Sequence, residues 1–187
     1  AAQSVFWTVG IIEAAVIIAN EFPTEPLSKA ILSTLMMSGR TQSLLTMNRT
    51  AITGASLIAL GTLYRMHCYR VMKGFFTFDL SVRQNHKLIK TGPYSLVRHP
   101  SYLGLLVVYA GMFCWYGTGG SWLRESGILD TTGGSVFFGG FTVTMVTFMV
   151  GLLRRMPIED AAMRKRFGQE WDDWAREVPD MVIPGVI

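Results

Sequence analysis

The sequence predicts an all-α, polytopic integral membrane protein with four to five transmembrane helices, a polar loop facing the cytosol and a C-terminal helix. Half of the 187 residues are hydrophobic and 16% are charged, whereas soluble domains have about 25% charged residues. The mean hydropathy is +0.32. A soluble enzyme with a conventional polar surface is therefore not expected. Disorder is excluded, because five Trp, six Tyr and eleven Phe provide ample apolar surface to bury.

Four apolar stretches are long enough to cross a bilayer as helices, which takes roughly 17 residues or more. In chain order they are 4–20, 50–69, 102–118 and 133–153. The first contains Glu13, and an acid within a span is expected to face a partner, a cavity or the headgroups. The stretch 27–47 is interrupted by Lys29 and Arg40. It is either a short fifth span or a helix that lies in the interface.

Small residues recur on two of these stretches at helical spacing. Ala51, Ala55 and Ala59 are four residues apart, and Gly104 and Gly111 are seven apart. Because small side chains let helices approach closely in lipid, both sets predict packing faces.

The distribution of Lys and Arg predicts the orientation in the membrane. Seven of the seventeen lie between Arg65 and Arg98, and six lie between Arg154 and Arg176. The loop 119–132 has only one. By the positive-inside rule, the segment 65–101 and the C-terminal tail face the cytosol. The net charge of +4 therefore reflects topology, and no nucleic-acid partner is expected.

Cysteine and histidine spacing gives little support for a metal or a disulfide framework. Cys68 and Cys114 form no CxxC pair and are expected to be small apolar fillers. His86 and His99 lie thirteen residues apart without a third ligand. No metal site is predicted.

The polar segment 85–104, which precedes the third apolar stretch, is rich in turn signals. Residues 91–94 read Thr-Gly-Pro-Tyr, which is typical of a turn. His99 is followed by Pro100, which ends a preceding helix and permits a new one to begin. An irregular loop with His, Arg and Tyr thus lies against the start of a span. Such backbone is tolerated where protein covers it or where it lines a cavity.

A simpler interpretation of the same loop is a basic segment that reaches the lipid headgroups. It accounts for Lys87, Lys90 and Arg98. It does not account for the His, Tyr, Gly and Pro at fixed turns.

The tail after the fourth stretch predicts a further helix from about Pro157 to Val178, ended by Pro179. An apolar stripe of this helix is expected to pack on protein or on the bilayer surface; it comprises Phe167, Trp171, Trp174 and Val178. If helix continues through the junction, Arg155 and Glu159 share one face. They then form either a local ion pair or part of a site at the cytosolic edge.

Taken together, these motifs resemble the isoprenylcysteine carboxyl methyltransferase family. The resemblance rests on TGPYSLVRHPSYLG at 91–104, RxxxED at 155–160 and FGxEW at 167–171 with Val-Pro at 178–179. It covers roughly 86–179. The RHPxYxG element alone is shared with other membrane methyltransferases and some sterol reductases, so the joint pattern is the more specific one.

The resemblance implies a role for each matching position. Arg155 would hold the substrate carboxylate, and Glu159 would bind the cofactor. Asp79 matches a further cofactor position only loosely, and Asp160 departs from the family, which more often has a second Glu there. The cofactor pocket would otherwise be lined by His86, Lys87, Leu88, Ile89, Tyr94, His99, Pro100, Ser101 and Tyr102.

The activity implied is methylation of the C-terminal carboxylate of prenylated cysteine in CaaX proteins, with S-adenosyl-L-methionine (SAM) as methyl donor. Prenylated CaaX proteins and membrane lipid would be the partners. The location would be the endoplasmic reticulum, with the active site facing the cytosol. The whole chain would be one methyltransferase domain, divided into N-terminal spans (1–70), cytosolic cofactor loop (71–101), helical hairpin (102–153), and C-terminal helix and tail (154–187).

Two alternatives stay open. One is a phospholipid N-methyltransferase acting on phosphatidylethanolamine, whose ammonium group needs a base such as His86 or His99. The other is a structural or lipid-binding membrane subunit without enzymatic activity, which would bind no SAM.

Overall fold

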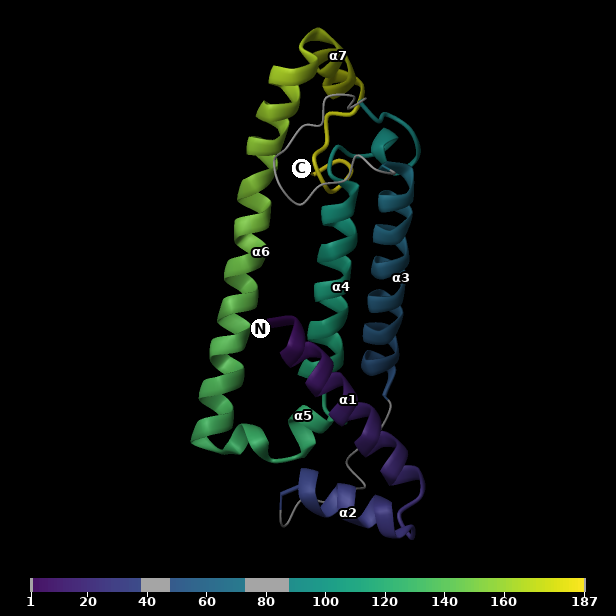
Figure 1. Cartoon of the computed structure of the whole chain (residues 1–187), viewed down its shortest axis with the longest axis vertical. Helices are drawn as coiled ribbons and strands as arrows, with labels where there is room; N and C mark the ends of the chain where they lie inside the picture. The colour runs from purple at the N-terminus through teal and green to yellow at the C-terminus, as the bar shows by residue number, and fades with distance from the viewer. Residues whose placement is uncertain (1, 38–47, 73–87, 187) are drawn as a thin grey trace. The chain divides into compact units, whose positions relative to one another are not determined.

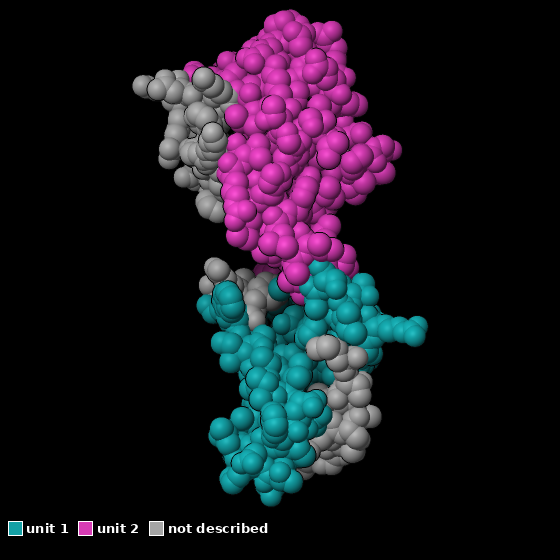
Figure 2. Space-filling view, turned by 90° about the vertical axis from the view of Figure 1, so that its right-hand side faces the viewer, with its two compact units in different colours: residues 1–56, 110–143 teal, residues 57–109, 144–187 magenta. Residues whose placement is uncertain are grey.

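The computed structural model describes residues 2–37, 48–72 and 88–186. Every regular element in these ranges is helical, which confirms the all-α prediction. The chain divides into two compact units (Figure 2). Unit 1 comprises 1–56 and 110–143, and unit 2 comprises 57–109 and 144–187.

Two helical segments of the described chain are long and apolar enough to cross a membrane. They are Pro100–Glu125, which includes α4 (Pro100–Gly117), and α6 (Thr132–Phe167). Only 11% and 6% of their apolar windows are buried inside the protein, whereas the core helix of a soluble protein is mostly buried. The exposure of these long apolar helices supports a membrane protein. The predicted total of four to five spans stays a prediction.

Unit 1 contains α1 (Ala2–Glu21), α2 (Pro26–Leu35) and the short α5 (Trp122–Glu125) (Figure 1). The carboxylate of Glu13 accepts the backbone N–H of Trp122 at 3.0 and 3.1 Å. The indole N–H of Trp122 donates to the Leu35 carbonyl at 2.8 Å. Glu13 therefore faces a protein partner, one of the three outcomes expected for it.

The ambiguous stretch 27–47 is resolved only in part. Its described portion is α2, whose 10 residues rise about 15 Å, half the thickness of a hydrocarbon core. Residues 38–47 lie outside the described ranges.

Glycines determine where α3 (Arg49–Met72) meets α4 in each unit. In unit 2, a Cβ on Gly61 would lie 2.7 Å from the Gly104 carbonyl oxygen, and in unit 1 a Cβ on Gly54 would lie 2.8 Å from that of Gly111. The predicted packing role of Gly104 and Gly111 is confirmed. The face expected on α3 is wrong beyond Ala51, because Ala55 and Ala59 are exposed. The helices contact through residues that lack a Cβ altogether.

In unit 2, α6 continues through Pro157 and ends at Phe167. The expected new helix starting at Pro157 is therefore wrong. Proline cannot donate to the preceding turn, but the helix tolerates that one missing bond. The break comes instead at Gly168, whose φ of 55° is favourable for glycine. The helix α7 (Gln169–Glu177) follows.

A small apolar core in unit 2 lies beneath the loop that precedes α4. Its buried members are Cys68, Tyr94, Trp174 and Val178. Trp171 packs at its edge, so three of the four residues of the predicted stripe pack as expected. The cysteine is a small apolar filler, also as expected. This core positions the 3₁₀ turn η3 (Gly92–Ser95) against α7.

Candidate functional site

The loop before α4 and the C-terminal tail pair through their backbones. The N–H of Arg98 donates to the Asp180 carbonyl at 3.0 Å, and the N–H of His99 donates to the Met181 carbonyl at 2.7 Å. These two segments are about eighty residues apart in the chain. The structure thus brings them to one end of unit 2, as the predicted topology requires.

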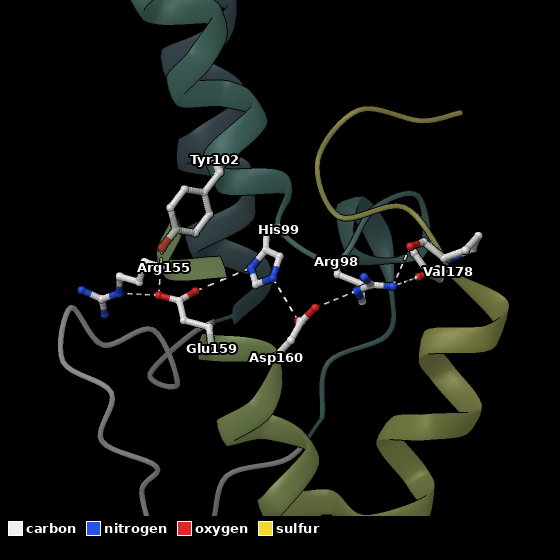
Figure 3. Close-up of polar contacts among 8 residues, drawn as sticks. Arg98, His99, Tyr102, Arg155, Glu159, Asp160 and Val178 are labelled. Carbon is white, nitrogen blue, oxygen red and sulfur yellow. Dashed lines mark hydrogen bonds and ion pairs between the residues drawn. The ribbon is translucent and has the colours of Figure 1, made fainter. Parts of the chain in front are cut away.

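A row of charged side chains connects the loop to α6 (Figure 3). Arg155 Nε lies 2.7 Å from Glu159 Oε1, and His99 Nδ1 lies 3.6 Å from Glu159 Oε2. His99 Nε2 lies 3.0 Å from Asp160 Oδ1, and Arg98 Nε lies 3.1 Å from Asp160 Oδ2. We call these five residues the charged row. Guanidinium groups form its two ends, and two carboxylates flank the imidazole.

The helical geometry of α6 explains half of this row. Because α6 is continuous, Arg155 and Glu159 are four residues apart on one face, and Asp160 follows directly. The ion pair considered from the sequence is therefore present. It is not isolated, since Glu159 also contacts His99 and Tyr102.

The other half comes from Arg98 and His99, which directly precede α4. The carbonyl of His99 accepts the N–H of Tyr102 at 3.0 Å, so the two side chains share one face. Their rings meet edge to face at 5.6 Å. The Tyr102 hydroxyl donates to Glu159 Oε1 at 2.8 Å. Glu159 Oε1 thus accepts from both Tyr102 and Arg155.

Arg98 is buried rather than directed at lipid headgroups. Its side chain is 10% exposed, and its Nη1 donates to the carbonyls of Val178 at 3.0 Å and Pro179 at 2.7 Å. The guanidinium also lies 6.0 Å from the Trp171 ring centroid. The headgroup interpretation is therefore wrong for Arg98. Lys90 pairs with the side chain of Glu170 at 3.3 Å.

The remaining predicted site residues fall into three groups. Leu88 and Ile89 pack against the apolar core around Tyr94. Pro100 is fully buried, and the carbonyl of Ser101 accepts a hydrogen bond from Arg65. The others lie outside the described residues; they are Asp79, His86 and Lys87.

Hydrogen-bond donors gather in the apolar core around Tyr94. Burial, together with the nearby Cys68, raises the pKa of Tyr94 above its ordinary value, so the hydroxyl stays protonated and can donate. The indole N–H groups of Trp171 and Trp174 are buried and meet no acceptor in the described part of the chain. Unpaired buried donors are costly, so this region suits a ligand with acceptor atoms.

Sequence reasoning missed the roles of Asp160 and Arg98. The family resemblance marks Asp160 as a departure and gives it no role, yet it joins His99 to Arg98. The signal available was adjacency, because each lies next to a predicted site residue, Glu159 or His99. Adjacency alone does not reveal a contact across sixty residues.

Parts of this sequence are similar to known methyltransferases. The family model described as phospholipid methyltransferase matches residues 49–123, a range that includes α3, the loop and α4. Protein-S-isoprenylcysteine O-methyltransferase B of Arabidopsis thaliana is 26% identical over 134 residues, 69% of this chain and 57% of that protein. A probable protein-S-isoprenylcysteine O-methyltransferase of Oryza sativa subsp. indica is 27% identical over 130 residues, 67% of this chain and 56% of that protein.

The chain thus spans just over half the length of the curated relatives it matches. No solved structure matches it significantly. The matches confirm the resemblance seen in the loop and tail motifs. By sequence, the chain is similar to protein-S-isoprenylcysteine O-methyltransferases, and part of it matches the phospholipid methyltransferase family model.

Proposed function

We propose that this chain is a SAM-dependent membrane methyltransferase that acts on the C-terminal carboxylate of prenylated cysteine in CaaX proteins. The observation that supports this best is the charged row, in which the loop before α4 and the end of α6 converge on Glu159. The names of the curated relatives support the choice of substrate.

The residues present fit the proposed cofactor. Glu159 is 22% exposed, whereas Asp160 is 12% exposed and holds two buried partners. Glu159 is therefore the more accessible carboxylate for the cationic groups or ribose hydroxyls of SAM. Tyr94 and the two indole N–H groups offer donors for its acceptor atoms, and Leu88 and Ile89 offer apolar surface. When bound, SAM supplies an electrophilic methyl group on a sulfonium.

The proposed pocket is completed by six further residues from the loop and the start of α4: His86, Lys87, His99, Pro100, Ser101 and Tyr102. Within it, His99 is a positioning group. Its Nε2–H donates to Asp160, because a carboxylate only accepts, and its Nδ1 faces Glu159. The ring thereby fixes the spacing between the two carboxylates.

The acceptor chemistry needs no general base. A prenylcysteine carboxylate has a pKa of about 3.5 and is ionised at neutral pH. What remains for the protein is to bind, orient and desolvate it, and orientation alone is worth several kcal/mol, of order ~7 in good cases. We assign the carboxylate to Arg155, whose guanidinium can bind it by a fork of two hydrogen bonds. The bond from its Nε to Glu159 fixes that guanidinium.

The membrane arrangement completes the proposal. Four to five spans would let the prenyl chain approach from the lipid phase while SAM enters from the cytosol. The charge distribution supports a cytosolic site, and the endoplasmic reticulum is proposed from the family resemblance.

A phospholipid N-methyltransferase is the second candidate, supported by the family model over 49–123. Its ammonium acceptor must lose a proton, so a base is required near the methyl group. His99 is the histidine in the described part of the site, and both its ring nitrogens face carboxylate oxygens. The geometry therefore favours the carboxylate acceptor.

The test is a methyl-transfer assay on the purified full chain in nanodiscs, with label in the methyl group of SAM. N-acetyl-farnesylcysteine is compared with phosphatidylethanolamine, and the farnesylcysteine methyl ester is the blocked control. We expect base-labile label in the farnesylcysteine product and none with the ester. Label only in phosphatidylethanolamine would select the second candidate, and no SAM binding at all would leave the non-enzyme alternative.

A further inference from the structure

Arg65 on α3 contacts only neutral groups among the residues that the structure describes. Its Nη1 donates to the Ser101 carbonyl at 2.8 Å, and its Nη2 donates to the Tyr69 hydroxyl. The guanidinium also lies over the Tyr69 ring, 5.3 Å from the centroid. Arg65 is partly buried, so water compensates its charge only in part.

The partners of Arg65 differ from those of Arg98 and Arg155. Arg98 and Arg155 each contact a carboxylate, Asp160 and Glu159 respectively. Among the described residues, Arg65 contacts none. Within the described ranges, the positive charge of Arg65 therefore has no carboxylate counter-ion. A guanidinium withdrawn from water favours a bidentate carboxylate or phosphate partner.

The fold places Arg65 beside the charged row. Ser101, which accepts its hydrogen bond, precedes Tyr102, which donates to Glu159. Gly104 leaves room for the Arg65 side chain, because a Cβ there would lie 2.6 Å from Arg65 Cγ. The first turn of α4 thus contacts a guanidinium of α3 through the Ser101 carbonyl and a carboxylate of α6 through the Tyr102 hydroxyl.

The neighbours of Arg65 on α3 point to the kind of ligand. Leu63 and Met66 are 61% and 43% exposed, so the turn of α3 that contains Arg65 also presents apolar side chains on its exposed face. A ligand that matches both is an amphiphile with an apolar chain and one anionic group. A prenylcysteine has both features.

We propose that Arg65 binds the carboxylate of the prenylcysteine acceptor and makes the site selective for an anionic acceptor. This inference rests on the proposed function and adds an α3 residue to it. Arg65 then acts together with Arg155, so that the acceptor carboxylate is attracted from two helices.

The experiment measures binding to the full chain in phosphatidylcholine nanodiscs saturated with the SAM product, S-adenosylhomocysteine. The probes are N-acetyl-farnesylcysteine and its neutral C-terminal amide. Because a hydrogen bond to a charged group has a net worth of about 1.5–3 kcal/mol, we expect Arg65→Gln to weaken carboxylate binding at least tenfold. Amide binding should change less than twofold. Arg70→Gln, at an exposed position of the same helix, is the matched control and should change neither constant.

A second variant keeps the test valid if Arg65→Gln fails to fold. In Arg155→Gln, Arg65 is intact, so the carboxylate should still bind better than the amide. Equal binding of the two probes there would overturn the proposal, as would an unchanged carboxylate constant in folded Arg65→Gln. If Arg65→Gln instead loses only the stabilisation given by added phosphatidylglycerol, the anion is a lipid phosphate and the proposal is also wrong. A wild-type chain that selects the carboxylate but transfers no methyl group would refute the proposed function alone.

Discussion

Asp160→Asn is the substitution that most sharply probes how the loop is held to the tail. The side chain of Asp160 is 12% exposed and accepts from Arg98 Nε at 3.1 Å and His99 Nε2 at 3.0 Å. Replacing its carboxylate by an amide removes the negative charge while leaving the Arg98 cation buried. Losing one partner of a buried pair costs about 3–5 kcal/mol. Arg98 keeps the carbonyls of Val178 and Pro179, so we expect about 2 kcal/mol here.

The readout is hydrogen exchange of two backbone amides. The N–H groups of Arg98 and His99 donate to carbonyls of the tail, so they exchange when the loop and tail separate. A loss of about 2 kcal/mol corresponds to roughly 30-fold faster exchange through that opening. The control is Asp173→Asn, because Asp173 is 52% exposed and pairs with Arg176 at the surface, where such pairs are worth about 0–1 kcal/mol. Unchanged protection in Asp160→Asn would refute the role given to this carboxylate.

Three further results are expected. Arg155→Ala should spare SAM affinity but lower methyl transfer at least tenfold, because a hydrogen bond to a charged group is worth about 1.5–3 kcal/mol. Glu159→Ala should instead weaken the binding of SAM. Calorimetry measures SAM affinity and a turnover assay measures methyl transfer, so together they separate the two variants. Burial raises the pKa of Tyr94, so the fold is stabilised as long as this hydroxyl stays neutral. The contribution is fully present below the unfolded pKa of about 10 and is lost as pH rises towards the folded pKa. Tyr94→Phe should therefore flatten the decline in melting temperature above pH 10. Gly104→Ala places a Cβ 3.0 Å from a backbone oxygen of α3 and should cost about 1–3 kcal/mol, while Gly139→Ala, with nothing within 4 Å, should not lower the melting temperature.

The helices were predictable because their signals are local. Apolar length located α1, α3, α4 and α6, and Pro100 marked the start of α4. The continuation of α6 through Pro157 was not predictable, because the same residue suits a helix start or a tolerated interior position. The α3 packing face was mistaken because alanines and glycines give similar patterns in sequence. On α3, Gly54 and Gly61 are the positions where a Cβ would clash with α4.

The site was predictable as two segments but not as a network. Loop motifs and charge distribution located His99, Tyr102 and Glu159 at one end of the chain's fold. The contacts of Asp160 and Arg65 depend on how α6 and α3 rotate against α4, and no local pattern encodes that rotation. In the sequence, Arg65 is one basic residue near the end of the apolar stretch 50–69. Its hydrogen bond to Ser101 became visible only in three dimensions.

The most direct test of the central claim is calorimetric titration of the full chain with SAM. The proposed function requires that the loop before α4 and the end of α6 form one cofactor site. It predicts saturable binding at one site per chain, weakened by His99→Ala in the loop and equally by Glu159→Ala in α6. Normal affinity in either variant, or no saturable binding to the wild-type chain, would contradict it.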